Sequence, residues 1–230
     1  MTGRVRSHWK EMSCLIVLAV DTSGSTASCA LTENGSLLGY RMLYTKRAHS
    51  QILLPMVKEL IAETGHTVQE VDVFAAANGP GSYTGLRIGI SAMQALAFAG
   101  NKTCAGISTL EGLACNRCGR TGILCACLAA RKNLCYCAFF ESNGRTVTRL
   151  TEDAVLEAGD IAAQIEHYSE PVMVIGDGTA ILRESCEGFL EAPMHLRDQS
   201  ACGIAMAAMR TEPVPPEALS VSYLQAVKIG

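Results

Sequence analysis

The sequence lacks an apolar run long enough to cross a membrane. A spanning helix needs about 20 consecutive apolar residues, whereas the run from Leu15 to Val20 ends at Asp21. The same run is too short for a secretory signal, and no small-residue cleavage site follows it. We therefore expect a cytoplasmic protein that does not enter a membrane.

An excess of positive charge is also missing. The 19 Lys and Arg residues against 22 Asp and Glu residues give a formal net charge of −3, and the chain has no run of like charges. A nucleic-acid backbone is held largely by excess positive charge. We therefore expect nucleic acid to reach this chain only with the help of a partner.

The motifs of several enzyme classes are absent. No lysine follows the glycine loop at 79–85 with the spacing of a nucleotide-binding P-loop, and no G-x-S-x-G sequence marks a serine nucleophile. His49 begins a helical pattern, but Leu53 stands where a second metal-ligating histidine would be needed. We therefore predict no catalytic residue and no bound metal.

Cysteine is abundant, but the number of cysteines, 11, is odd. The chain is also too long and too apolar for a secreted domain stapled by disulfides. A structural zinc site needs two closely spaced pairs, and only Cys115 and Cys118 have the C-x-x-C spacing. The next four cysteines alternate as on two strands, at Cys125, Cys127, Cys135 and Cys137. We favour reduced thiols that pack in the core over a zinc site.

What the sequence does contain is material for a buried core. Apolar residues make up 49% of the chain and charged residues 18%, which is typical of a globular protein. In the first half, apolar periodicity predicts strands at 15–20, 26–31, 37–44, 71–77 and 103–107, and helices at 50–63 and 86–99. Pro55 either kinks the first of these helices or marks a later start.

The second half partly repeats this order of elements. We predict strands at 123–129, 134–141, 146–150 and 172–175, and helices at 158–167 and 179–185. Helices that return to strands favour an α/β fold, here in two lobes with mixed sheets flanked by helices. The first lobe would span 13–108 and a second, smaller lobe 109–230, while 1–12 would be a disordered leader.

Three loops that follow strands have the composition of phosphate-binding loops, because they could present backbone N–H groups to an anion. The residues concerned are Asp21, Thr22 and Ser23 in the first loop, Gly79, Gly81 and Ser82 in the second, and Gly176 and Gly178 in the third. Ordinary turns are the alternative interpretation of each. For the first and third loops the ordinary turn is the better interpretation, and for the second the two are even.

Four segments together resemble the TsaB (YeaZ) family: LAVDTSGSTASCAL, HSQILLPMVKEL, ANGPGSYTGLRIGISAMQALA and GISTLEGLA. The resemblance is dense over residues 14–113 and thins beyond them. Ala129 stands where the family's DARRxEVY-like motif has Asp, and Gln225 follows Tyr223 and Leu224 where the family has the sequence YLR.

The resemblance implies the actin-like ATPase (ribonuclease-H-like) fold. It also implies a non-catalytic scaffold or activator that pairs with TsaD. With the ATPase TsaE, these subunits form threonylcarbamoyl-adenosine beside the anticodon of tRNAs that read codons beginning with A. Alone, the chain would form a homodimer, require no cofactor and bind nucleotide weakly at most, while the complex uses ATP and contacts tRNA.

The helix at 86–99 is apolar on nearly every side, so we expect it to be covered on more than one side. Its stripe of small residues, with the neighbouring helix, is expected to be exposed and to contact TsaD or a second copy of the chain. The residues expected at this interface are Ile52, Met56, Leu60, Gly85, Gly89, Ala92 and Met93.

Two other functions stay open from the sequence. A nucleotide-binding homodimer would use the loops at 21–25 and 176–179, and nucleotide titration would reveal it. A degenerate metal-dependent transferase or protease of the same fold is disfavoured, because Leu53 and Ala129 replace the histidine and aspartate it would need.

Overall fold

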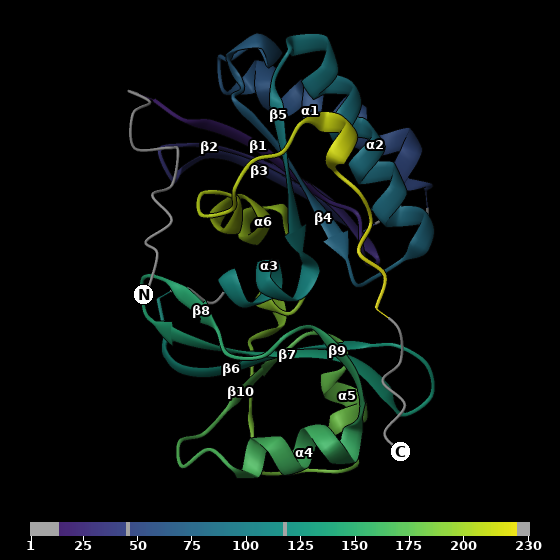
Figure 1. Ribbon diagram of the computed structural model, residues 1–230, viewed down its shortest axis with the longest axis vertical. Helices are drawn as coiled ribbons and strands as arrows, with labels where there is room; N and C mark the ends of the chain where they lie inside the picture. The colour runs from purple at the N-terminus through teal and green to yellow at the C-terminus, as the bar shows by residue number, and fades with distance from the viewer. Residues whose placement is uncertain (1–13, 45–46, 117–118, 225–230) are drawn as a thin grey trace.

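Figure 1 shows the computed structural model of the chain, which describes residues 14–44, 47–116 and 119–224. Two lobes are stacked along the long axis of the molecule, and each is built round one sheet. Helices flank both sheets, so the predicted two-lobed α/β architecture is confirmed. The leader expected at 1–12 lies outside the described residues.

The first sheet has five strands in the order β3-β2-β1-β4-β5. The strands are β1 (Ile16–Asp21), β2 (Thr26–Glu33), β3 (Ser36–Tyr44), β4 (Val73–Gly79) and β5 (Thr103–Ser108). β1, β2 and β3 form an antiparallel meander, whereas β4 and β5 run parallel to β1. Parallel neighbours need crossover connections, which α1 (His49–Glu63) and α2 (Tyr83–Gly100) provide.

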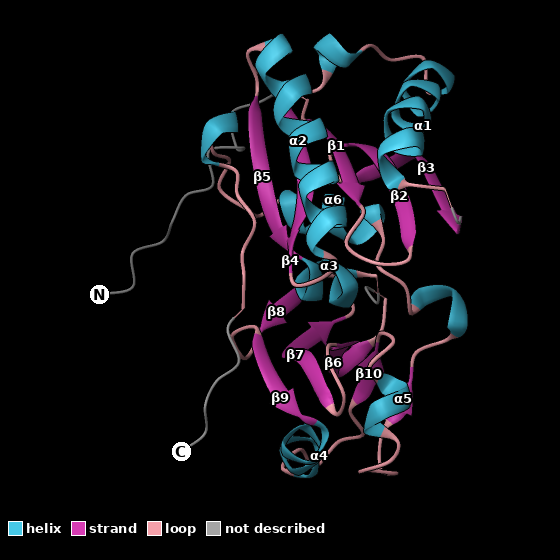
Figure 2. Ribbon diagram, turned by 90° about the vertical axis from the view of Figure 1, so that its right-hand side faces the viewer, coloured by secondary structure: helices cyan, strands magenta, loops and turns pink. Residues whose placement is uncertain are grey.

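Burial of β1 on both faces explains its unbroken apolar sequence. Leu18 and Val20 belong to the core beneath α1 and α2, which run along the sheet in Figure 2. Val17 and Ala19 point the opposite way, toward the core beneath α3 (Thr109–Cys115) and α6 (Ala201–Ala208). These two short helices lie between the sheets of the two lobes.

The second sheet has the order β11-β10-β6-β7-β8, with β9 paired to β7. Its strands are β6 (Thr121–Ala129), β7 (Leu134–Asn143), β8 (Val147–Arg149), β9 (Ala154–Glu157), β10 (Met173–Ile175) and β11 (Leu190–Glu191). Helices α4 (Ala158–Glu166) and α5 (Thr179–Leu182) pack on the outer face of this sheet. Single turns of 3₁₀ helix are found at η2 (Val68–Glu70), η3 (Met194–Leu196) and η4 (Pro216–Ala218).

Each predicted strand and helix has a counterpart in the structure, with boundaries shifted by a few residues. Pro55 lies inside α1, which begins at His49, so the alternative of a later start is wrong. Sequence periodicity missed α3, α6, β9 and β11. α6 is apolar on most sides because it is covered by the first sheet and by α3 together.

The chain returns to the first lobe after building the second. The N–H and carbonyl of Cys104 pair with those of Val214 at 2.8 Å, and the Ser222 N–H donates to the Asn78 carbonyl at 2.8 Å. Gln94 holds the intervening turn by donating to the Pro216 carbonyl at 2.8 Å. Residues 200–222, which were expected in a second lobe spanning 109–230, therefore pack on the first sheet instead.

No helix in the described ranges is both long enough and apolar enough to cross a membrane.

Candidate functional site

The loop after β1 is organised round the Asp21 carboxylate. Asp21 is buried, and its Oδ1 accepts hydrogen bonds from the Ser23 N–H at 2.8 Å and the Ser23 hydroxyl at 2.6 Å. This is the Asx-type turn that we weighed against a phosphate loop. Burial raises the pKa of Asp21 to about 6, and the hydrogen bonds from Ser23 offset part of that rise.

The glycine loop between β4 and α2 is fastened to the loop after β1. The Ser82 N–H donates to the Ser23 carbonyl at 2.7 Å, and the Thr22 hydroxyl donates to the Gly85 carbonyl at 2.7 Å. The Ser82 hydroxyl also accepts from the Gly85 N–H at 3.2 Å, which caps α2. The loop thus connects two strand ends and begins a helix, as a tight strand-to-helix turn would.

Glycine is needed in these loops because backbone and side chains of this chain fill the adjacent space. A Cβ atom added at Gly85 would lie 2.0 Å from the Thr22 carbonyl oxygen, and one added at Gly81 would lie 2.6 Å from the Ser23 carbonyl oxygen. At Gly24 an added Cβ would meet the Gln199 side chain at 2.6 Å. The two loops therefore pack closely against each other and against Gln199.

The third loop is packed in the same way against β6. An added Cβ at Gly176 would lie 2.1 Å from the Cys127 carbonyl oxygen, and one at Gly178 would lie 2.6 Å from the Cys127 sulfur. Asp177 accepts a hydrogen bond from the Ala129 N–H at 2.8 Å. This loop attaches α5 to the second sheet, and its contacts are those of a structural turn.

The residues expected at an exposed partner interface are mostly buried inside the first lobe. Burial applies to Ile52, Met56, Leu60, Gly85, Gly89 and Met93, while Ala92 is half-buried. A Cβ added at Gly89 would lie 2.6 Å from the Thr22 hydroxyl. The expectation that this stripe is exposed is wrong, because the small residues let α2 approach β1 and its loop closely.

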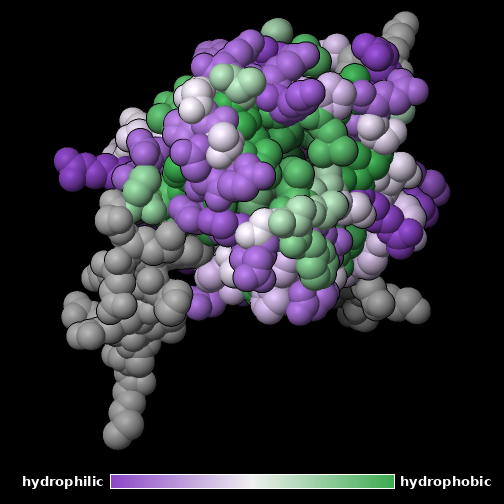
Figure 3. All heavy atoms as spheres, turned by 90° about the horizontal axis from the view of Figure 1, so that it is seen from above, coloured by the Kyte–Doolittle hydropathy of each residue, from purple (hydrophilic) through white to green (hydrophobic). Residues whose placement is uncertain are grey.

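A different stripe faces outward where α1 and α2 lie side by side, and we call it the outer α1–α2 face. Ile88, Ala92 and Ala95 follow one another at helical spacing on α2, and Leu54 on α1 is 49% exposed. In Figure 3, which views the first lobe end on, apolar residues gather toward the middle of the surface within a polar rim. The first lobe thus presents apolar surface outside its own core.

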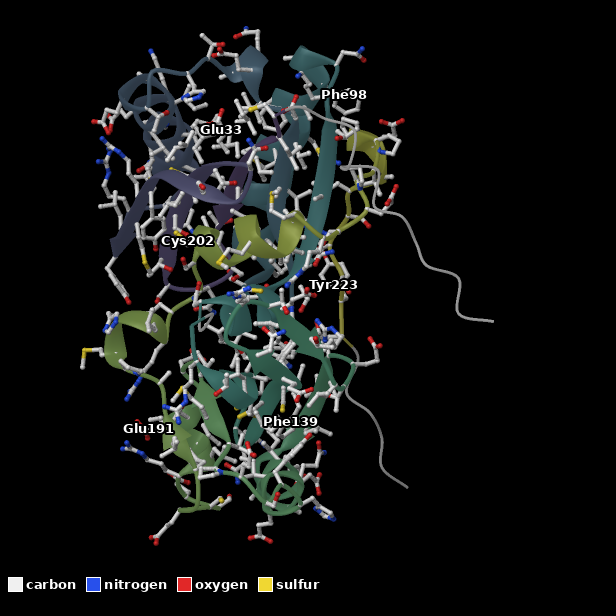
Figure 4. The ribbon with its side chains drawn as sticks, turned by 90° about the vertical axis from the view of Figure 1, so that its left-hand side faces the viewer. Glu33, Phe98, Phe139, Glu191, Cys202 and Tyr223 are labelled. Carbon is white, nitrogen blue, oxygen red and sulfur yellow. The ribbon has the colours of Figure 1, made fainter. Side chains whose placement is uncertain are left out.

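An exposed aromatic cluster lies at the start of α2, and the sequence patterns did not predict it. The rings of Tyr83 and Tyr223 stack with centroids 5.7 Å apart, and the Arg87 guanidinium lies 4.0 Å from the Tyr83 centroid. Arg87 also donates to the Tyr223 hydroxyl at 3.2 Å. Tyr223, labelled in Figure 4, lies near the end of the returning segment. The similarity of Tyr223 and Leu224 to the family's YLR sequence was the signal that could have indicated this contact.

The cysteines of β6 and β7 pack beneath α4 and α5, as expected for core thiols. Cys125, Cys127, Cys135 and Cys137 are buried, and the Cys125 and Cys137 sulfurs lie 3.7 Å apart. A hydrogen bond to Cys137 and burial raise the pKa of Cys125. Within the described ranges no group of three or more His, Cys, Asp or Glu side chains could hold a metal ion. Cys118 lies outside the described residues.

Comparison with known proteins gives the family. The family model for TsaD, tRNA N6-adenosine threonylcarbamoyltransferase, matches residues 43–224. The chain is 27% identical to the tRNA threonylcarbamoyladenosine biosynthesis protein TsaB of Bacillus subtilis, over 76% of this chain and 77% of that protein. It is 31% identical to TsaB of Escherichia coli, over 70% of this chain and 71% of that protein.

The fold comparison agrees with the sequence comparison. The structure of YeaZ from Pseudomonas aeruginosa superposes with a TM-score of 0.80 at 28% identity, over 91% of this chain and all of that one. The two-lobed fold, the HSQxLLP and GPGSYTGLRIG motifs and the matched relatives all agree with one family. The chain belongs to the TsaB (YeaZ) family, and more broadly to the family that the TsaD model describes.

Proposed function

We propose that the chain is a non-catalytic subunit in the formation of threonylcarbamoyl-adenosine beside the anticodon of tRNAs that read codons beginning with A. In this role it pairs with TsaD and works with the ATPase TsaE, and tRNA reaches it only through the complex. The names of its relatives support the pathway. One observation supports the non-catalytic role: the glycines of these loops pack closely against backbone and side-chain atoms of the chain itself.

The absence of expected catalytic groups agrees with this role. Leu53 is buried one turn after His49 and supplies no metal ligand there. Ala129 lies at the end of β6, and it contributes only its backbone N–H, which donates a hydrogen bond to the Asp177 carboxylate. We therefore expect the purified chain alone neither to hydrolyse ATP nor to modify tRNA. The modification should require TsaD and TsaE to be added, and should fall sharply when this chain is left out.

The outer α1–α2 face is the surface that we assign to TsaD. Apolar side chains at Leu54, Ile88, Ala92 and Ala95 offer a helical partner a seam between two helices. The buried residues beneath them hold α1 and α2 to the sheet, so the seam is presented by a rigid support. In the absence of TsaD, a second copy of this chain would cover the same seam.

The test places a charge on the seam without disturbing the core. Ala92→Arg should weaken binding to TsaD by about tenfold or more, because an unpaired guanidinium would be desolvated at the interface. Ala163→Arg, an exposed alanine of α4 in the other lobe, is the matched control and should bind as the wild type does. Calorimetric titration with TsaD measures both, and circular dichroism checks folding.

Three outcomes would contradict the proposal. Unchanged TsaD affinity in a folded Ala92→Arg variant would place the interface elsewhere. ATP turnover by the purified chain, surviving removal of contaminating ATPases, would make it an enzyme. Stoichiometric nucleotide binding by an isolated homodimer would favour the alternative of a nucleotide-binding protein.

A further inference from the structure

A hollow of about 180 Å³ lies where the two lobes meet, beside α6. Both lobes supply its lining: the end of β2 and α6 belong to the first sheet's layer, whereas the β7–β8 hairpin belongs to the second lobe. The side chains on which the argument depends are Thr32, Arg145, Met206, Met209 and Arg210. Figure 4 shows α6, marked by Cys202, between the two sheets.

The hollow contains a buried hydroxyl that is left without a partner. Thr32 is 3% exposed, and its Oγ1 makes no hydrogen bond to any described residue. Buried polar atoms are nearly always paired, so an orphaned hydroxyl that lines a hollow indicates a missing water or ligand atom. The opposite face of β2 is occupied by the core under α1, so Thr32 is directed toward α6 and the hollow.

Two guanidinium groups at the hollow are poorly neutralised. The Arg145 side chain has no hydrogen-bond or ion-pair partner in the part of the chain that the structure describes, although its backbone N–H donates to Asn143. Arg210 lies 3.9 Å from Glu111, which is shared with Arg149 at 3.5 Å, and it donates a hydrogen bond to the Cys115 sulfur at 3.5 Å. The rim of the hollow therefore carries the exposed Arg145 guanidinium and a weakly neutralised Arg210 guanidinium.

The rest of the lining is apolar and adaptable. Met206 lies in the last turn of α6, and Met209 directly follows that helix. Their flexible thioethers can adjust to aliphatic chains of different shape. A volume of 180 Å³ leaves room for a short organic molecule.

We infer that this hollow binds a small aliphatic carboxylate. The carboxylate contacts the Arg145 and Arg210 guanidinium groups, which are suited to bidentate pairing with it. The aliphatic chain packs against Met206 and Met209, and the Thr32 hydroxyl donates to a ligand oxygen. Because the lining comes from both lobes, the ligand joins them, and binding is independent of the surface assigned to TsaD.

The test uses butyrate as the probe and the full chain labelled with ¹³C at its methionine methyl groups. We expect the Met206 and Met209 methyl resonances to shift saturably with butyrate, while those of Met56 and Met93, in the core under α1 and α2, stay in place. n-Butylammonium, which has the same chain and the opposite charge, should produce no saturable shift. Substitution of each methionine by leucine assigns the resonances.

Two variants and a control connect the shift to the proposed contacts. Arg145→Gln should weaken butyrate binding by about tenfold, and Thr32→Val, which keeps the shape of the side chain, should weaken it as well. Arg120→Gln removes the same charge from an exposed position outside the hollow and should leave binding unchanged. The absence of a saturable shift would mean that the hollow holds water only. An equal response to butylammonium, or unchanged binding by a folded Arg145→Gln variant, would also overturn the inference.

Discussion

At the scale of single residues, Asp21 is a buried carboxylate whose charge opposes folding. Its pKa of about 6 in the folded protein lies above the ordinary value of 3.8. The folded state therefore binds more protons than the unfolded state between these values, and stability falls as pH rises through that window. A shift of this size corresponds to about 3 kcal/mol, at about 1.4 kcal/mol for each pH unit.

Asp21→Asn should therefore raise the free energy of unfolding near neutral pH and change it little at about pH 4. The amide oxygen can still accept both hydrogen bonds from Ser23, so the turn is kept. Urea unfolding at the two pH values measures the difference, with the exposed Glu187→Gln as control. A variant that is equally or less stable near neutral pH would show that the carboxylate has an ionic partner in solution.

The glycines of the fastened loops give a second prediction at this scale. Gly85→Ala should destabilise the protein by about 2–4 kcal/mol, because the added methyl would overlap the Thr22 carbonyl oxygen. Gly159→Ala, in α4 with open space around the added Cβ, should instead stabilise by about 0.5–1 kcal/mol. Urea unfolding separates the two. Equal effects would mean that Gly85 contributes only helix propensity.

At the scale of elements, the returning segment is an integral part of the first lobe. Leu219 is 4% exposed and belongs to the core with α2 and β5. Leu219→Ala should cost about 2–4 kcal/mol by leaving a cavity, whereas the more exposed Leu190→Ala should cost much less. Thermal unfolding with both variants checks this. If Leu219→Ala unfolds as the wild type does, the segment is detached in solution.

The strands β6 and β7 give a prediction about the thiols. Cys125 and Cys127 are buried under α4 and α5. Hydrogen bonds to Cys137 and Cys135 respectively, together with burial, raise the pKa of both thiols, so they should resist alkylation in the folded protein. The partly exposed Cys186 should react before Cys125 and Cys127. Peptide mass spectrometry after timed treatment with iodoacetamide measures the order, and elemental analysis should find no stoichiometric zinc. Rapid modification of Cys125 in the native state would show that this sheet opens readily.

At this scale, local periodicity in the sequence was enough to predict the positions of helices and strands. Leu53, Val57 and Leu60 recur at helical spacing and locate α1, and the apolar run of β1 indicates a buried strand. The spacing of Gly85 and Gly89 correctly indicated a close approach, but spacing does not tell which neighbour approaches. The backbone that fills this space comes from Thr22, more than sixty residues earlier, and only the folded chain brings it there.

At the scale of the whole molecule, the resemblance of the motifs gave the family and the two-lobed fold, and the structure gave the division between the lobes. Residues 200–222 look like a simple continuation of the second half. Their contacts are with α3, with the first sheet and with α2, and the pairing of Cys104 with Val214 spans more than a hundred residues. Contacts of such long range leave no periodic signal, which is why α6 and the hollow beside it were missed.

The return of the chain to the first lobe sets an order of events during synthesis. The second sheet is made from one continuous stretch and can form as soon as that stretch leaves the ribosome, whereas the first lobe waits for residues 200–222. Until then the side of the first sheet that α6 covers, with Ala19 and Ala75 on it, is open to solvent. The nascent chain thus carries a paired second sheet beside an incomplete first lobe, and the apolar surface that α6 covers is closed last.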